Sequence, residues 1–239
     1  MDRLSPTRRP EGPNDGVQRW RELLFIHWPV PVEAVRPLIP ERLSLDTFDG
    51  VLYVGIVPFR MEHVAPGWLP EAMAFNFLET NLRTYVHLDG ESPGVWFFSL
   101  EAASWLAVRA ARVGWSLPYH DARMRLTHEG EKVHYDSKRR SLERPRFEVS
   151  YTVGEALGPS EPGTLQHFLL ERYLLYSVRR GQLHRGQVYH TPYPAHAATV
   201  TEVHDDLCAA AGLPGPQGLP PVVHYAPGVD VEVFAVKPV

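Results

Sequence analysis

Four polar side chains of different chemistry follow one another at two-residue steps in the segment F-N-F-L-E-T-N-L-R-T-Y-V: Glu79, Asn81, Arg83 and Tyr85. The segment alternates as a β-strand does, so these side chains share one face, roughly 7 Å apart. The same face begins with two phenylalanines, and aromatic rings favour places from which water is partly excluded. The pattern therefore predicts the wall of a pocket that holds a small polar ligand.

Glu79 and Arg83 carry the chemistry that this face predicts. Glu79 can act as a general acid or base if burial beside Phe77 raises its pKa. The planar guanidinium of Arg83 suits a carboxylate, which predicts a keto or hydroxy acid as the ligand. The alternative is a structural ion pair between Glu79 and Arg83. Asn81 and Tyr85 offer neutral hydrogen-bonding groups either to a ligand or to the backbone.

Tyr119 and His120 form a second candidate pair. They are adjacent in a segment that alternates as a strand, so only one of them can face a pocket. Ala122 and Leu126 share the face of His120 and have the character of core residues. We therefore favour Tyr119 as the residue that faces the ligand.

His27 and Glu101 complete the candidate ligand-binding residues. His27 lies within an apolar strand segment, I-H-W-P, where a hydrogen-bonded core histidine is favoured over a functional one. Glu101 has the parity of Val95 and Phe97, so it either projects inward or begins a helix favourably at its N-terminus.

The elements that must position these residues are mainly strands. Strands are predicted at residues 20–28, 51–60, 75–86, 95–101, 119–127, 131–139, 146–153 and 183–189, with a last strand after a turn at A-P-G. Helices are predicted at a short V-E-A-V-R-P-L-I-P segment, at residues 102–113, at residues 165–178 after a Thr164 cap, and near residues 205–211. No regular β-α alternation occurs, which predicts an α+β fold with a largely antiparallel sheet or barrel.

Composition excludes several classes of function. The chain has 239 residues, a net charge of -4 and a single cysteine, Cys208. Residues 1–16 combine basic charge with Pro and Gly, so we predict that they form a disordered tail. No linker divides the rest of the chain, so we predict one domain over residues 17–239. The charge gives no general attraction to nucleic acid. A single cysteine excludes an internal disulfide and suits a reducing compartment, so we expect a cytoplasmic location. No long apolar run or secretory signal occurs, so we expect no membrane partner.

Cofactor and metal motifs are absent from the sequence. The twelve histidines include no H-E-x-x-H and no Cys/His pairing, so no metal is expected. Neither G-x-G-x-x-G after a strand nor a phosphate-binding G-x-x-x-x-G-K-[ST] occurs, so no nucleotide cofactor is expected.

A series of motifs in order along the chain resembles the YqjF-like family, a branch of the acetoacetate decarboxylase-like superfamily. The motifs are L-L-F-I-H-W-P-V-P, N-F-L-E-T-N-L-R-T-Y-V, P-G-V-W-F-F-S-L-E-A, L-P-Y-H-D-A-R-M, L-L-E-R-Y-L-L-Y and H-Y-A-P-G-V-D-V. The resemblance implies a mixed α+β domain built around a β-barrel or cone with a small-molecule cavity inside. It also implies that a strand glutamate and arginine line the cavity.

The chain departs from the decarboxylase at its catalytic amine. The resemblance implies a pair of lysines after the Ala-rich segment, one of which forms a Schiff base with the keto acid. Tyr119 and His120 stand at those positions here, and the chain has only Lys132, Lys138 and Lys237. Amine-catalysed decarboxylation is therefore not expected.

Two functions remain open on the sequence. The first is a lyase- or hydrolase-like enzyme that acts on a small keto or hydroxy acid, with Glu79 as the acid-base group and Arg83 as the anchor. The second is a non-catalytic ligand-binding or sensing module with the same cavity. A small-molecule ligand or substrate is the expected partner in both, and the sequence is compatible with a homo-oligomer.

Overall fold

The computed structural model describes residues 1–66, 74–104 and 116–239. Its strands are β1 (Gly16–Val30), β2 (Leu43–Leu45), β3 (Leu52–Pro66), β4 (Phe75–Leu88), β5 (Glu91–Ala102), β6 (Tyr119–Glu129), β7 (Lys132–Arg139), β8 (Arg146–Gly158), β9 (Leu174–Arg179), β10 (Gln182–Tyr189), β11 (Ala195–Asp205) and β12 (Val222–Pro238). Its helices are α1 (Val32–Val35), α3 (Leu165–Leu170) and α4 (Leu207–Ala210), with 3-10 turns η1 (Ser5–Thr7) and η2 (Arg36–Leu38).

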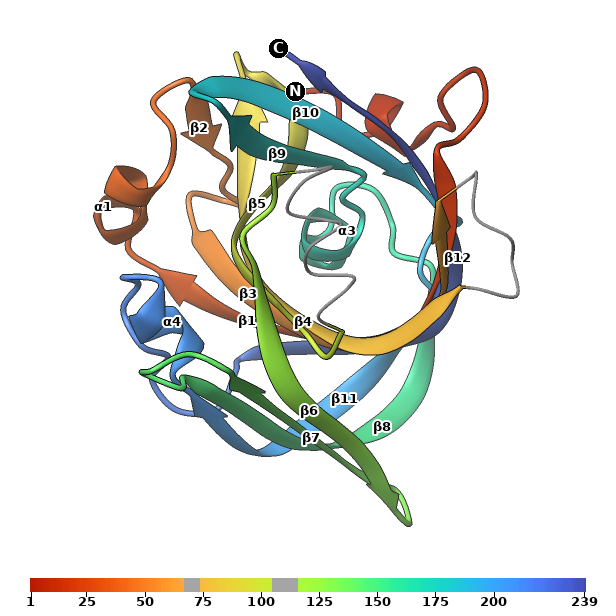
Figure 1. Cartoon of the computed structure of the whole chain (residues 1–239), viewed down its shortest axis with the longest axis vertical. Helices are drawn as coiled ribbons and strands as arrows, with labels where there is room; N and C mark the ends of the chain where they lie inside the picture. The colour runs from red at the N-terminus through yellow and green to blue at the C-terminus, as the bar shows by residue number, and fades with distance from the viewer. Residues whose placement is uncertain (67–73, 105–115) are drawn as a thin grey trace.

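The described strands form one 12-stranded sheet that closes on itself twice. The first circuit runs β12-β1-β3-β4-β5-β9-β10 and returns to β12, with α3 inside it (Figure 1). The second circuit shares β12-β1-β3-β4-β5 and closes through β6, β7, β8 and β11. Strand pairs are antiparallel except β5–β6 and β5–β9. The fold is therefore α+β with a largely antiparallel, ring-like sheet, as predicted.

Because the two circuits share strands, the shared strands β1, β3 and β4 bury side chains on both faces over much of their length. One face packs on the inner core, around α3 inside the first circuit, which includes Leu23, Phe25, Tyr53, Phe59, Phe77, Tyr85, Leu100, Tyr119, Phe168, Leu169 and Tyr193. The other face packs on the second core, which includes Leu24, Ile26, Val54, Ile56, Leu82, Val86, Tyr135, Phe147, Val149 and Tyr151. The odd residues of β4 thus face the inner core, and the even residues face the second core.

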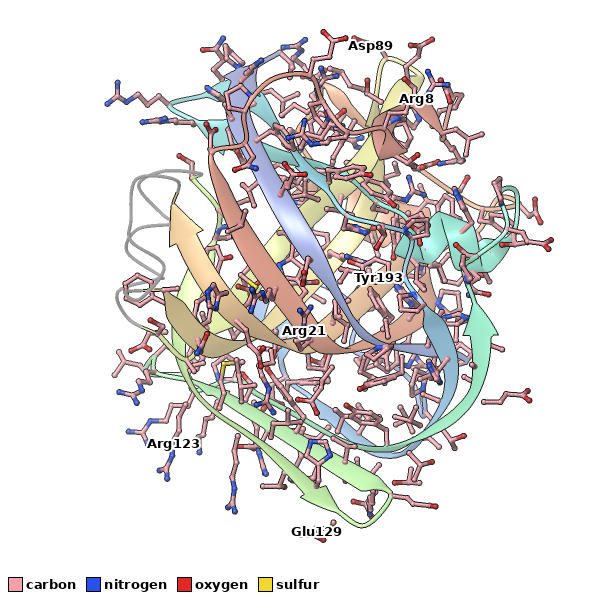
Figure 2. All side chains as sticks on the ribbon, turned by 90° about the vertical axis from the view of Figure 1, so that its right-hand side faces the viewer. Arg8, Arg21, Asp89, Arg123, Glu129 and Tyr193 are labelled. Atoms are coloured by element: carbon pink, nitrogen blue, oxygen red, sulfur yellow. The ribbon has the colours of Figure 1, made fainter. Side chains whose placement is uncertain are left out.

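Several predicted elements are confirmed. Strands β4 and β5 form the expected hairpin, with Tyr85 opposite Val95. Strands β6 and β7 form the expected two-stranded ribbon, and Figure 2 shows Arg123 and Glu129 of β6 projecting away from the body. The short helix after β1 is present as α1 and η2. Most of the helix predicted at residues 102–113 lies outside the described residues, and Ala102 itself ends β5.

The helix predicted at residues 165–178 is wrong in its second half. Thr164 caps α3 as predicted, because its hydroxyl accepts a hydrogen bond from the His167 N–H at 3.2 Å. The helix ends at Leu170, and the chain continues as β9, which pairs with β5 and β10. A short apolar run with a β-branched residue fits a helix and a buried strand equally well, so the pattern did not separate the two.

The predicted turn at A-P-G is also wrong, because β12 runs through it. Leu23 pairs with Ala226 and Arg21 with Gly228, so β1 and β12 each skip one residue and remain paired. A side chain at Gly228 would collide with the carbonyl oxygen of Trp20. Glycine therefore serves here for close strand approach and not for chain reversal.

The first 15 residues lie against the body of the molecule. Arg3 forms an ion pair with Asp46 at 2.6 Å, and Arg9 forms one with Glu232 of β12 at 2.6 Å. The disordered tail over residues 1–16 stays a prediction, and these contacts give two of its arginines ionic partners on the rest of the chain. No helix among the described residues is long and apolar enough to span a membrane.

Candidate functional site

Glu79 is buried on the inner face of β4, and the described residues give it no cationic partner. The residue is 3% exposed, and its Oε2 accepts a hydrogen bond from the Tyr119 hydroxyl at 2.9 Å. Burial raises the pKa of Glu79 to about 8, although the Tyr119 hydrogen bond opposes this shift. Among the described residues no basic group lies within 4.0 Å of its carboxyl group. Glu79 therefore holds its proton at neutral pH.

Arg83 lies four residues further along the same face, roughly 13 Å from Glu79 along the strand. Its Nη2 donates a hydrogen bond to the carbonyl oxygen of Leu169 in α3 at 3.1 Å. Its guanidinium lies 5.6 Å from the ring centre of Phe25 and 5.8 Å from that of Tyr85. No carboxylate of the described chain pairs with it, and its Nε is buried without a hydrogen-bond partner.

Asn81 lies between these two residues, and like Arg83 it has a buried polar atom without a hydrogen-bond partner among the described residues. Its Oδ1 is buried, and the described residues offer it no donor. Glu79, Asn81 and Arg83 retain 3%, 6% and 7% exposure, whereas Tyr85 retains 0%. The first three residues of the face thus keep a small accessible surface, and the fourth keeps none.

Tyr85 and His27 close the far end of this face. The Tyr85 hydroxyl donates to the Leu169 carbonyl at 2.8 Å and lies 2.7 Å from Nε2 of His27. Burial lowers the pKa of His27 well below its usual value, so the ring is neutral. The ring fits only because Gly55 faces it, since a Cβ there would lie 2.7 Å from the ring. Nδ1 of the same ring is buried without a hydrogen-bond partner among the described residues.

Glu101 does not join this site. It lies on the opposite face of the sheet, next to Thr80 in the strand register, and forms an ion pair with Arg139 of β7. Its Oε2 also lies 3.3 Å from the Ser99 hydroxyl, which donates to it. The prediction that Glu101 projects inward or begins a helix is therefore wrong. The bulge between Leu82 and Arg83 in the β4–β5 register shifts its parity away from that of Val95 and Phe97.

Tyr119 and His120 separate as strand geometry requires. Tyr119 belongs to the inner core and reaches Glu79, whereas His120 pairs in register with Glu101 and shares its face. The tyrosine thus stands beside the acid on the inner face.

The sequence did not single out a second group of inner residues. Glu171 is 6% exposed and accepts hydrogen bonds from the Tyr173 hydroxyl at 2.6 Å and from the Tyr193 backbone N–H at 3.0 Å. His190 stacks on Tyr173, and Figure 2 shows Tyr193 within the body of the molecule. The signal was available as two charges, Glu171 and Arg172, inside an apolar run, because buried charges need partners. The predicted helix over residues 165–178 included both residues, so their charges were not recognised as a sign of buried partners.

Arg172 is a buried arginine whose charge is paired with an acid. Its guanidinium pairs with Asp46 at 2.9 Å, lies 4.2 Å from the ring centre of Phe168 and donates to that residue's carbonyl oxygen. Arg139 is likewise paired with Glu101. Arg83 differs from both, because the described residues supply it with no acid. No three His, Cys, Asp or Glu side chains gather as a metal site in the described ranges.

This ring around a central helix is the acetoacetate decarboxylase-like fold. The structure is similar to acetoacetate decarboxylase from Legionella pneumophila, with a TM-score of 0.65 and 16% identity, covering 97% of this chain and 91% of that one. It is equally similar to the enduracididine biosynthesis enzyme MppR complexed with pyruvate, with a TM-score of 0.65, 12% identity and coverage of 95% and 91%.

The sequence identifies the branch of this fold. The chain belongs to the DUF2071 family of uncharacterized conserved proteins, whose model matches residues 17–230. It is 36% identical over 222 residues to the protein YqjF of Bacillus subtilis, covering 91% of each chain.

Proposed function

We propose that the chain binds a small carboxylic acid inside the first circuit, with Arg83 as its anchor and Glu79 as the acid-base group that acts on it. One observation carries this proposal: Glu79 and Arg83 lie buried on one strand face and do not neutralise each other. A structural pair would have used the cation to hold the carboxylate ionised.

The anchor role follows from the electrostatics of Arg83. A buried guanidinium without a counter-ion is unfavourable by several kcal/mol, roughly, and the cost falls when an anion binds beside it. The unpartnered Nε–H and the remaining Nη protons can donate two parallel hydrogen bonds to one carboxylate. Binding a carboxylate would thus supply the anionic partner that the described part of the chain does not give to Arg83.

The acid role follows from the protonation state of Glu79. With its pKa near 8, the carboxyl group can donate its free proton to a ligand oxygen at neutral pH and accept a proton from it in the reverse step. The Tyr119 hydroxyl fixes the other carboxyl oxygen. Such a pair supports lyase- or hydrolase-like chemistry on a keto or hydroxy acid. A similar fold binds pyruvate in MppR, which is consistent with a ligand of this size.

A non-catalytic binding or sensing role is the second candidate. It is favoured by the positions of the lysines, since Lys132 and Lys138 lie on the β6–β7 ribbon and Lys237 near the end of β12. No amine of the described chain therefore stands beside Glu79, where Tyr119 lies instead.

Calorimetric titration of pyruvate, acetoacetate, lactate and 3-hydroxybutyrate into the full chain tests the anchor. Arg83→Gln should weaken binding at least about tenfold, because a charge-assisted bidentate contact is lost. Arg123→Gln, which removes an exposed arginine on the ribbon, should leave affinity unchanged. Equal affinity of Arg83→Gln and the wild type would overturn the anchor.

Proton NMR of the same mixtures tests the chemistry. Glu79→Gln should retain binding within a few-fold and slow any conversion of the acid by at least about 100-fold. Conversion at the wild-type rate in Glu79→Gln would exclude the acid-base role. Arg83-dependent binding with no conversion by the wild type would favour the sensing module.

A further inference from the structure

His190 is a buried histidine packed against aromatic side chains of the inner core. His190 follows β10 directly and is 1% exposed, with its ring clamped between aromatic side chains. The ring centroid of Tyr173 lies 4.4 Å away in a stacked arrangement, that of Tyr193 lies 4.5 Å away and that of Trp20 lies 5.9 Å away. Glu171 holds Tyr173 and the Tyr193 backbone by hydrogen bonds, so the imidazole has little freedom to reorient.

The tautomer of His190 follows from its backbone contact. Nδ1 lies 2.8 Å from the carbonyl oxygen of Thr191, which can only accept a hydrogen bond, so Nδ1 carries the proton. Burial, with a smaller contribution from the charge of Arg83, lowers the pKa of His190 to about 4 against the opposing effect of the Thr191 hydrogen bond, so the ring is neutral. Nε2 therefore presents a bare lone pair.

No donor of the described chain reaches that lone pair. Nε2 is buried and lacks a hydrogen-bond partner, as does the Oδ1 of Asn81. An unsatisfied buried acceptor is unfavourable by about 1–3 kcal/mol, so a group that supplies a donor would be selected over one that does not. Ring contacts link this histidine to Arg83, whose guanidinium lies 5.6 Å from the Phe25 ring centre. The Phe25 and Tyr193 ring centres are 5.1 Å apart, and Tyr193 lies 4.5 Å from His190, so both residues border the same part of the inner core.

We propose that His190 is a specificity-determining residue that accepts a hydrogen bond from the hydroxyl group of a 2-hydroxy acid whose carboxylate is held by Arg83. The inference rests on the proposed function, since it names the substrate class of that same site. A 2-oxo acid brings only acceptors to Nε2, and two acceptors repel. An amino acid would bring an ammonium group next to the buried guanidinium, which like-charge repulsion disfavours.

The fixed positions of the arginine and the imidazole have a stereochemical consequence. With the carboxylate on Arg83 and the hydroxyl on His190, the two enantiomers of a 2-hydroxy acid place their remaining substituent on opposite sides. One enantiomer of lactate should therefore bind more tightly than the other, and both the preference over pyruvate and the preference between enantiomers should depend on His190.

The test is calorimetric titration of D-lactate, L-lactate and pyruvate into four forms of the full chain: wild type, His190→Phe, His184→Phe and Arg83→Gln. Phenylalanine keeps the stacking on Tyr173 but removes the lone pair. In the wild type one lactate enantiomer should bind at least about tenfold more tightly than pyruvate. In His190→Phe that lactate should lose about tenfold, with pyruvate affinity unchanged. His184→Phe, a change at a histidine on β10, should behave as the wild type.

The outcomes separate the inference from the function on which it rests. If lactate and pyruvate bind equally in the wild type and Arg83→Gln weakens both, the carboxylate site stands and the role of His190 is wrong. If His190→Phe weakens lactate and pyruvate alike, the residue is structural and the inference is also overturned. If neither acid binds, or Arg83→Gln binds both as the wild type does, the proposed function fails and the inference fails with it.

Discussion

At the scale of single residues, the same side chain has different roles on the two faces of one sheet. Glu79 and Glu101 are both buried, and burial raises the pKa of both. Arg139 opposes that shift at Glu101, whereas within the described ranges Glu79 has the neutral hydroxyl of Tyr119 as its hydrogen-bond partner. The acid without a cation is therefore the one suited to exchange a proton near neutral pH.

The first prediction concerns the pH dependence of stability. The folded-state pKa of Glu79 is about 8 against an unfolded value of 4.5, so the folded chain binds more protons between these pH values. Stability therefore falls as pH rises through this window. Glu79→Gln mimics the neutral acid and lacks this pH dependence. As pH rises from 6 to 8, the wild type should therefore lose roughly 2 kcal/mol of its free energy of unfolding relative to the variant.

Urea denaturation of the two proteins at several pH values measures this difference. Glu101→Gln is the matched control, because it leaves Arg139 without its acid and should destabilise the protein at every pH in this range. Parallel pH profiles for Glu79→Gln and the wild type would show that Glu79 is ionised throughout.

At the scale of elements, the C-terminal end of α3 is held by the strands around it. The Leu169 carbonyl, one of the last of the helix, accepts hydrogen bonds from Arg83 and from Tyr85. Such carbonyls have no partner within the helix and must find one outside it. The strand face that carries the candidate site therefore also fixes the helix that fills the first circuit.

The second prediction tests this helix end. Tyr85→Phe removes the hydroxyl that donates to Leu169 and contacts His27, so it should lower the free energy of unfolding by about 1–3 kcal/mol. Tyr225→Phe, at a half-buried tyrosine whose hydroxyl has no hydrogen bond among the described residues, should change it by less. Urea denaturation measures both, and a larger loss for Tyr225→Phe would contradict the role of Tyr85.

The third prediction concerns the close packing of β1 on β3. A Cβ at Gly55 would lie 2.7 Å from the His27 ring, so Gly55→Ala should lower the free energy of unfolding by about 1–3 kcal/mol. The loss should shrink in a His27→Ala background, which a double-mutant cycle measures. Gly215→Ala faces open space and should be nearly neutral. Equal losses in both backgrounds would rule out the contact.

The sequence predicts an element well where its side-chain pattern is unambiguous, and poorly where distant residues decide the structure. Strict alternation over residues 75–86 gave both faces of β4 correctly, because a strand buried on both sides has no other register. The segment after Leu170 was predicted as helix, since the partners that end α3 come from Arg83 and Tyr85, far away in the chain. The same distance hid His190 and Glu171, whose roles depend on contacts inside the circuit.

At the scale of the whole molecule, the N-terminal segment contacts residues of distant elements. Arg3 donates hydrogen bonds to Asp46, which also accepts one from the buried Arg172. The guanidinium of Arg3 lies 4.9 Å from the Phe168 ring centre. The N-terminal residues thus reach the outer end of the network that surrounds α3. Composition reports on apolar surface, so it does not predict ionic partners that distant elements supply.

The fourth prediction compares the two arginine contacts of this segment. Arg3→Ala should lower the free energy of unfolding by about 1 kcal/mol, because its ion pair is partly buried and shared with Arg172. Arg9→Ala should have a smaller effect, since its pair with Glu232 is exposed to solvent. Denaturation at low and high salt measures both, and a larger effect of Arg9 would contradict the described packing.

The most direct measurement is a carbon-13 NMR titration of the glutamate carboxyl groups of the wild type, with the Glu79 signal assigned by its loss in Glu79→Gln. An acid that faces the inner core without its cation should titrate with a midpoint near pH 8. A midpoint at or below 4.5 would mean that a positive group holds Glu79 ionised, and the separation of acid from anchor would be wrong.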